Sequence, residues 1–193
     1  MGRYVGPTHK LCRREGVPLC GREDCPVRTR LSAPGQHGAR RRRLSEYGLQ
    51  LRGKQRAKRI YGVREVQFKR YFKKALGSKE KTGEVLLQIL ERRLDNALYR
   101  AGFAKTRPHA RQMVGHSLVK VNGKRVTIPS YLVKVGDKIN LAKKDAPLYE
   151  EVVKPSWLKV EKEKREAEVK ALPKREEIGA EIDEKLIVEF YSR

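Results

Sequence analysis

The stretch that decides the fold is "LERRLDNALYRAGFAKTRPHARQMVGHSLVKVNGKRVTIPSYLVKVGDKINLA", residues 90–142. Its first third completes a helix whose apolar residues recur at steps of three and four from Val85 to Leu98, and Gly102 suits the position just past its end. A shorter helix follows, with Pro108 in its first turn. Asn122-Gly123 then separates two alternating runs, which is a strong hairpin signal. We therefore expect a helix-helix-hairpin-strand unit over residues 90–142.

The flanking segments indicate a second, mainly helical part. Ser45 is a suitable cap for a basic helix that ends at Gly62. Residues 64–77 form a second helical pattern, and residues 182–190 regain an apolar face near the C-terminus. By contrast, residues 1–43 look irregular, and the alternating charges of residues 145–173 suggest a solvated helix or loop. The expected helical face of residues 64–77 comprises Val66, Phe68, Tyr71, Phe72, Ala75 and Leu76.

Charge indicates the kind of partner. The 193 residues include 46 Lys and Arg against 23 Asp and Glu, a net charge of +23, and only 38% are hydrophobic. Residues 1–80 hold 22 of the basic residues and six acidic ones, whereas residues 155–193 are nearly balanced. Such an excess needs a polyanion nearby, and nucleic acid is the usual one. The sequence contains no long apolar run and no secretory signal, so we expect a soluble protein.

All three cysteines lie in "THKLCRREGVPLCGREDC", residues 8–25. With His9 they give the spacing H-x2-C-x7-C-x4-C, and Cys3His is a known tetrahedral set for structural zinc. Inert thiols are the alternative, because the x7 and x4 spacings are loosely specified. The odd number of cysteines and the absence of a secretory signal argue against disulfides. The sequence has no C-x-x-C motif, which argues against a redox-active site. The predicted metal ligands are His9, Cys12, Cys20 and Cys25.

Residues 90–139 resemble, almost end to end, the RNA-binding module of the small-subunit ribosomal protein S-four family. "MGRYVGPTHKLCRREG" is similar to the N-terminus of that family, "PGQHG" to its turn before the first domain and "EKLIVEFYSR" to its C-terminal signature. The resemblance is to the bacterial type with a zinc-binding arm. That arm usually has four cysteines, and His9 stands here in place of the first.

The resemblance implies an α+β protein: a mainly helical first domain with a zinc knuckle arm and an inserted helix-helix-β-hairpin module. The expected boundaries are 1–44 for the basic arm, 45–91 with 173–193 for the first domain, 92–155 for the module, and 156–172 for a charged connector. The implied cofactor is one structural zinc ion. The implied location is the small ribosomal subunit in the cytoplasm.

The implied function is structural rather than enzymatic. Members of the family bind the 5′ domain of 16S rRNA at a multi-helix junction early in assembly, help to nucleate the 30S subunit and influence translational accuracy. They lie near the mRNA entry channel beside ribosomal proteins S-three and S-five. We therefore expect 16S rRNA, those two proteins and mRNA as partners, and neither a membrane nor a small-molecule substrate.

RNA of this kind is recognised through shape, phosphates and 2′-hydroxyls, which favours Arg and Lys on rigid elements. For any one of these basic residues a solvated surface charge is an equal alternative, and core packing is the alternative for the two tyrosines. A disordered arm is the alternative for the arginine run. The predicted RNA-binding residues are Arg3, Arg13, Arg14, Arg40, Arg41, Arg42, Arg43, Tyr47, Arg52, Lys54, Arg56, Arg59, Tyr61, Arg107, Arg111, His116, Lys120, Asn122 and Lys124.

Two other classes of protein compete with this interpretation. An RNA-modifying enzyme can carry the same module, but about 90 residues before it and 40 after leave little room for a catalytic domain. A zinc-dependent DNA-binding factor would need a C2H2 finger or a dimerising heptad, and the sequence has neither. The remaining alternative is another RNA-binding factor that uses the module.

Overall fold

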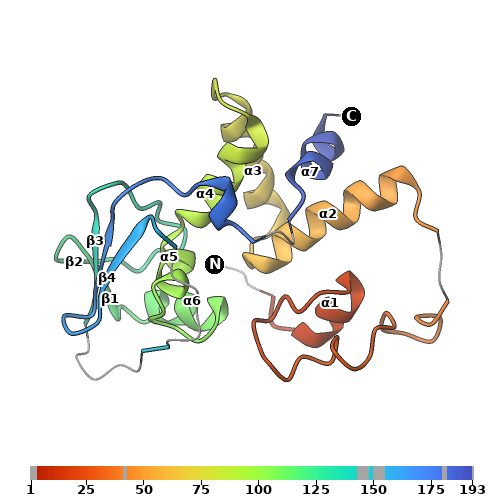
Figure 1. Cartoon of the computed structure of the whole chain (residues 1–193), viewed down its shortest axis with the longest axis horizontal. Coiled ribbons are helices and arrows are strands. Elements are labelled where there is room, and N and C mark those ends of the chain that lie inside the picture. Colours follow the sequence, from red (N-terminus) through yellow and green to blue (C-terminus); the bar gives the residue numbers. More distant parts are fainter. Residues whose placement is uncertain (1–3, 41–42, 143–147, 150–154, 180–181, 193) are drawn as a thin grey trace. The chain divides into compact units, whose positions relative to one another are not determined.

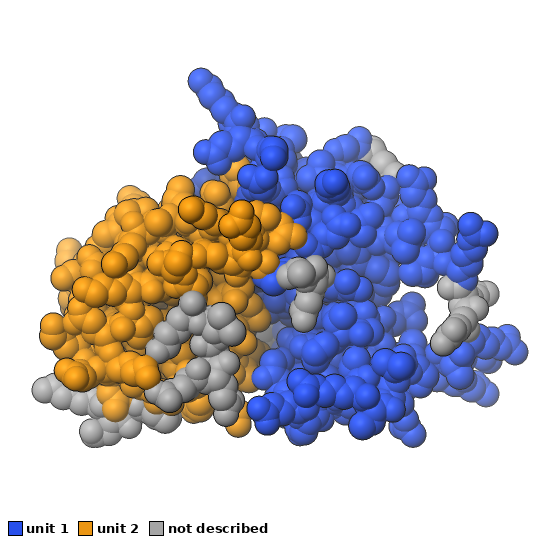
Figure 2. Space-filling view, viewed as in Figure 1, with its two compact units in different colours: residues 1–84, 179–193 blue, residues 85–178 orange. Residues whose placement is uncertain are grey.

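The computed structural model describes residues 4–40, 43–142, 148–149, 155–179 and 182–192, and it divides into two compact units (Figures 1 and 2). Unit 1 comprises residues 1–84 and 179–193, and unit 2 comprises residues 85–178. None of the helices in the described ranges is both long enough and apolar enough to cross a membrane. Helices together with an antiparallel sheet confirm the α+β class.

Unit 1 is helical. It contains α1 (Thr8–Glu15), α2 (Glu46–Ile60), α3 (Glu65–Leu76) and α7 (Glu184–Tyr191), together with the start of α4 (Thr82–Glu91). The helix α1 corrects the expectation that residues 1–43 are wholly irregular. Gly16 ends α1 in the left-handed conformation, with φ of 71°, and its N–H donates to the carbonyl of Cys12. The short helix therefore has an ordinary glycine C-cap, placed between two candidate metal ligands and the next cysteine.

The predicted cap of α2 is confirmed, because the Ser45 hydroxyl accepts from the N–H of Gly48 at 3.2 Å. Gly53 lies against α7: a Cβ added there would be 2.9 Å from the Cβ of Leu186. The small residue therefore allows α2 and α7 to approach closely. Aromatic rings close the same core, with the Phe72 and Tyr191 centroids 4.6 Å apart.

The apolar face of α3 is narrower than the sequence predicts. Phe68, Tyr71, Phe72 and Ala75 are buried as expected, but Val66 and Leu76 are 68% and 61% exposed. Leu76 lies at the margin of the buried stripe, whereas Val66 lies on nearly the opposite side of the helix from Phe68.

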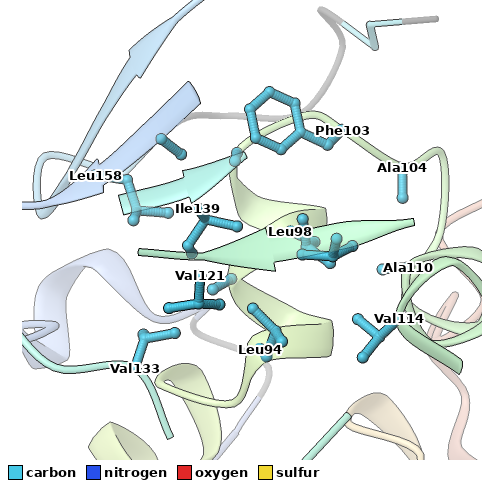
Figure 3. Packing of buried hydrophobic residues seen from close by; sticks show 14 of the residues in the cluster. Leu94, Leu98, Phe103, Ala104, Ala110, Val114, Val121, Val133, Ile139 and Leu158 are labelled. Atoms are coloured by element: carbon cyan, nitrogen blue, oxygen red, sulfur yellow. The ribbon is translucent and has the colours of Figure 1, made fainter. Parts of the chain in front are cut away.

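Unit 2 is the expected helix-helix-hairpin unit with an addition. The helices α5 (Leu94–Arg100) and α6 (Arg107–Gly115) precede β1 (Val119–Val121), β2 (Lys124–Arg125) and β3 (Lys138–Leu141). The hairpin is confirmed: β1 pairs with β2 antiparallel, and Asn122 and Gly123 both have positive φ, at 50° and 79°. Its core joins the two helices to one face of the sheet (Figure 3), with Leu94, Leu98, Val114, Val121 and Ile139 among its members.

The single long helix expected over residues 82–102 is instead two helices, α4 and α5, separated at Arg92 and Arg93. Arg93 is extended, with ψ of 137°, and forms an isolated bridge with Leu132. The N–H of Val133 donates to the carbonyl of Arg92 at 2.9 Å, and the Arg92 guanidinium returns a bond to the carbonyl of Val133. The helix stops because the returning segment 129–133 takes over backbone hydrogen bonds at this point.

The expectation of a charged connector over residues 156–172 is also wrong, because this segment contains two strands of the sheet. Residues 158–161 and 166–169 form β4 (Leu158–Glu161) and β5 (Glu166–Val169), which complete a sheet of order β2-β1-β3-β5-β4. Trp157 is buried in the module core. The physical reason is alternation: Ala167 and Val169 are buried in the core, while Glu166 and Glu168, which alternate with them, are only half-buried.

Candidate RNA interface and metal centre

The three cysteines meet in the arm of unit 1. Cys12 comes from the last turn of α1, and Cys20 and Cys25 follow in the loop after it. Their sulfur atoms all lie within 4.8 Å of one another, and all three cysteines are free thiols. Cys12 and Cys25 are buried with Val27 in a small cluster, against which Leu19 packs. The fold therefore brings together residues that are 13 positions apart in the sequence.

Burial and the neighbouring Cys20 raise the pKa of the Cys12 thiol to about 12. Metal ligands are thiolates, so an ion at this place would have to supply the charge that stabilises them. A tetrahedral zinc ion with bonds of about 2.3 Å places its sulfur ligands about 3.8 Å apart. The three cysteine sulfurs are near that spacing, so the donor set fits three corners of a zinc site.

His9 is not a member of this group of three. It is half-buried on α1, three residues before Cys12, and residues three apart share one face of a helix. The structure therefore places the predicted fourth ligand on the correct face but does not bring it into the cluster.

Several arm arginines lie where RNA could reach them. Arg14, Arg40 and Arg43 are exposed, whereas Arg13 is half-buried and donates to the carbonyls of Ser32 and Ala33 at 3.0 and 3.3 Å. Arg13 therefore ties α1 to the following loop. The predicted contacts Arg3, Arg41 and Arg42 lie outside the described residues.

The arginines of α2 face the end of α1. Arg52 donates to the Glu15 carboxylate at 2.9 Å, Arg59 pairs with the same oxygen, and Arg56 donates to the Glu15 carbonyl at 3.3 Å. The side chain of Glu15 is fully buried, and both arginine side chains remain about one-fifth exposed. The sequence missed Glu15, because a lone carboxylate in a basic arm gives no signal of its own. The three arginines join the arm to α2 and keep only part of their surface for RNA.

Two predicted RNA contacts are internal, and for these the prediction of a surface position is wrong. Lys54 is 5% exposed, donates to Glu65 at 2.8 Å, and its ammonium lies 4.2 Å from the centre of the Phe190 ring. Tyr61 is 4% exposed in the core, as the packing alternative expected. Tyr47 is half-exposed, with its ring centroid 5.7 Å from that of Phe190, so one side of it remains accessible.

The Glu65 carboxylate accepts hydrogen bonds from side chains of two helices. It accepts from Lys54 and Lys58 of α2 at 2.8 and 2.9 Å, and from the hydroxyl of Tyr191 of α7 at 2.9 Å. Partial burial works to raise the pKa of Glu65, but these three donors outweigh it and lower the pKa to about 2. Burial and the same contact raise the pKa of Tyr191. The cluster holds α2, the start of α3 and α7 together.

In unit 2, the first turns of α6 place Arg107 and Arg111 on one side of the helix. The Arg107 Nε donates to the Asn96 side-chain oxygen at 2.8 Å, and its guanidinium lies 4.5 Å from the Tyr99 ring centre. Arg111 donates to Asp95 at 3.2 Å, and Asp95 also binds the buried Arg93. Both arginines are partly exposed. Their geometry is therefore fixed before any partner arrives.

The residues that position these arginines come from the start of α5. Asn96 also donates to the buried Glu91 at 2.9 Å, and Glu91 pairs with Arg100. The sequence analysis did not nominate Asn96, nor Asp95 as a partner of Arg111. The signal was present: two polar residues within an otherwise apolar helical repeat must have buried partners.

The hairpin surface is mixed. His116 and Lys124 are exposed and Lys120 is half-buried, as an RNA-facing surface requires. Asn122 instead uses both ends of its amide within the fold: it donates to Asp137 at 2.8 Å and accepts from the N–H of Lys138. Its role in this structure is to connect the hairpin turn to β3.

Comparisons with known proteins also divide the chain into an N-terminal part and a following module. Residues 3–91 match the family model described as "Ribosomal protein S4/S9 N-terminal domain", and residues 92–139 match the model described as "S4 domain". The two matches meet where α4 ends. The small ribosomal subunit protein uS4 of Dictyoglomus thermophilum is 52% identical over the full length of both chains. The uS4A protein of Symbiobacterium thermophilum and the uS4 protein of Chromobacterium violaceum are each 50% identical, again over both whole chains.

Proposed function

Because this chain belongs to the uS4 family of small ribosomal subunit proteins, we propose that it binds the 5′ domain of 16S rRNA early in subunit assembly. As a member of that family it is a structural rRNA-binding protein and not an enzyme, and it works on the ribosome in the cytoplasm.

The observation that carries the proposal is the anchoring of Arg107 and Arg111. A guanidinium that is already held by Asn96 or Asp95 loses little side-chain entropy when it meets a phosphate. Arg also pairs with phosphate through two parallel hydrogen bonds, which Lys cannot do. The start of α6, with the neighbouring hairpin residues Lys120 and Lys124, is then the central RNA surface of the module.

The finer roles rest on family membership. They are nucleation of the 30S subunit at a multi-helix junction, a place near the mRNA entry channel beside ribosomal proteins S-three and S-five, and an effect on translational accuracy. Full-length identity of about one-half supports the transfer, because it leaves no domain of the relatives unmatched.

Reconstitution tests the assembly role. The small subunit is assembled from 16S rRNA and its other proteins with the wild-type chain, with none, or with an Arg107→Ala, Arg111→Ala variant. The variant should restore far less 30S particle than an equally charged Lys162→Ala, Lys164→Ala control. Equal yields from the variant and the control would contradict the proposed surface.

We further propose that Cys12, Cys20 and Cys25 hold one zinc ion with His9 as the fourth ligand. The His9 side chain would have to turn toward the three sulfur atoms, because it is not a member of their cluster. The ion would fix an arm that has few apolar residues, since structural zinc contributes on the order of 10 kcal/mol to such folds. Its chemistry there is purely structural, because four protein ligands leave no open position.

Metal content of protein purified under reducing conditions tests the zinc site. One zinc per chain is expected. His9→Ala should lower the affinity for zinc, whereas His37→Ala, a change at an exposed histidine of the same arm, should not. A metal-free wild-type protein would contradict the site, and equal effects of the two variants would remove His9 from it.

A further inference from the structure

Asn122 is the only one of the three asparagines in the sequence that precedes a glycine, since Asn96 and Asn140 are followed by alanine and leucine. In an Asn-Gly pair the backbone nitrogen of the glycine can attack the side-chain amide, because glycine has no Cβ to hinder the approach. A Cβ added at Gly123 would meet nothing within 4 Å, and Asn122 is itself exposed. The sequence and the open surroundings therefore favour a reaction at this turn.

The conformation of the turn opposes the same reaction. Asn122 and Gly123 form the two-residue turn between β1 and β2, with φ of 50° and 79°. In the left-handed region, a ψ of about 30° to 60° places the next backbone nitrogen on the side of the Cα–C bond away from Cβ. The nitrogen of Gly123 must reach the Cγ of Asn122 for a ring to close, so the turn has to open first.

Three hydrogen bonds hold Asn122 in this conformation, and all of them lead to the start of β3. Its backbone N–H donates to the carbonyl of Lys138 at 2.9 Å, and its side-chain oxygen accepts from the N–H of Lys138 at 2.9 Å. Its amide nitrogen donates to Asp137 at 2.8 Å. Asp137 is 8% exposed, and its second oxygen accepts from the N–H of Lys134. The carboxylate that faces the amide is thus largely buried and fixed in place.

We propose that Asn122 is a modification site at which spontaneous deamidation is controlled by folding. The Gly123 nitrogen gives up its proton and bonds to the Cγ of Asn122, the bond from Cγ to Nδ2 breaks, and ammonia leaves with that proton. Water then opens the five-membered ring at either of its two carbonyl groups. The product is aspartate, or isoaspartate with one more methylene group in the backbone. The reaction proceeds in chains whose hairpin is open and is suppressed where the turn is closed.

The product does not fit the turn. A carboxylate at position 122 replaces the amide donor and faces the acceptor oxygen of Asp137, so two negative charges meet where a hydrogen bond was. Isoaspartate also lengthens a turn of two residues, which disturbs the register of β1 against β2. Lys120 and Lys124 belong to these strands. The consequence for RNA rests on the proposed function: chains that stay unfolded lose the hairpin part of the RNA surface.

Peptide mass mapping of the full chain tests the site. The protein is incubated at mildly alkaline pH in buffer or in guanidinium chloride, and the fraction of chains with a new carboxylate at position 122 is followed over time. Deamidation should be about tenfold or more slower in the folded chain, which reacts only through local opening of the turn. Asn140 is the internal reference and should react far more slowly than Asn122 in guanidinium chloride. Equal rates for Asn122 in the two solutions, or for the two asparagines in guanidinium chloride, would overturn the proposal.

Two variants test the control by the turn. Asp137→Ala removes the partner of the amide and should raise the rate of deamidation in the folded chain about threefold or more, because the turn opens more often. Glu163→Ala changes an exposed acidic residue in the turn between β4 and β5 and should leave the rate unchanged. Thermal unfolding of both variants checks that each is folded during the incubation. Equal rates in the two folded variants would overturn the control by the turn.

Asn122→Asp reproduces the aspartate product and tests its effect. It should lower the midpoint of thermal unfolding and weaken binding to a 16S rRNA 5′-domain fragment about threefold or more. Adding Asp137→Asn exchanges donor and acceptor, because the new amide can donate to position 122 and still accept from the N–H of Lys134. The double variant should regain most of both losses, and recovery of neither would overturn repulsion as the cause. A wild-type chain that does not bind the fragment would contradict the proposed function, whereas the deamidation rates test this inference without RNA.

Discussion

The Nε atom of Arg107 donates to the side-chain oxygen of Asn96 at 2.8 Å, and this one bond fixes the direction of the guanidinium on α6. Tyr99 supports it from one face. Asn96 is itself held by the buried Glu91, so the Arg107 guanidinium is positioned by a chain of interior hydrogen bonds. The module therefore presents a directed group rather than a mobile charge.

Arg107→Lys tests this direction because it keeps the charge. Lysine cannot form the planar contact with Asn96 and Tyr99, so the variant should bind the 5′-domain fragment about fivefold more weakly, at unchanged salt slope. Arg125→Lys makes the same exchange at an exposed position of β2 and should change the affinity less than 1.5-fold in the same filter-binding assay. If both exchanges had equal effects, Arg107 would be acting as a simple surface charge.

Lys54→Met tests whether Lys54 is an interior residue rather than the RNA contact that the sequence predicts. The variant should keep its RNA affinity within about twofold of wild type. Its free energy of unfolding should fall by about 1 kcal/mol or more, because the change removes one partner of an ion pair and leaves the Glu65 carboxylate to Lys58 and Tyr191. Denaturant unfolding and RNA binding are measured on the same sample. A tenfold loss of affinity with normal stability would return Lys54 to the RNA surface.

Glu65→Gln tests the cluster that joins α2, α3 and α7. The folded pKa of Glu65 is about 2, below its ordinary 4.5, so the ionised form stabilises the fold. That contribution is complete above about pH 4.5 and is lost as the pH falls toward 2. The variant should be less stable than wild type by about 1 kcal/mol at pH 7, a figure reduced for the exposure of the carboxylate. The difference should shrink between pH 4.5 and 2. A difference independent of pH would show that the charge of Glu65 is unimportant.

Local signals predicted much of this fold. The Ser45 cap, the Asn122-Gly123 turn and the periodicity of α4 and α5 are short-range features, and each is present in the structure. The break at Arg92 and Arg93 was missed because neither residue disfavours a helix. It is imposed from a distance, by hydrogen bonds with Val133 and the adjoining strand.

The strands β4 and β5 were missed for a different reason. Their apolar residues alternate with charged residues, and alternating charges are also typical of a solvated helix or loop. Leu158 with Val160, and Ala167 with Val169, have the period of two that identifies a half-buried strand. This signal was readable in the sequence.

The sequence identified the kinds of residue at the site better than their partners. It nominated the arginines of α2 and α6 but not Glu15, Asp95 or Asn96, which hold them. The pairs of Glu15 with Arg52 and Arg59 join residues distant in the chain, and no local pattern encodes them. For the same reason Lys54 looked like one more surface charge, although its partner Glu65 lies on the next helix.

The most direct test of the account is a comparison of two RNAs. The affinity of the full chain is measured for a 16S rRNA 5′-domain fragment and for a fragment of equal length from another domain, across a series of salt concentrations. We predict at least tenfold preference for the 5′ domain at physiological salt, with affinity that falls steeply as salt rises. Equal affinity for the two fragments at every salt concentration would contradict specific rRNA binding.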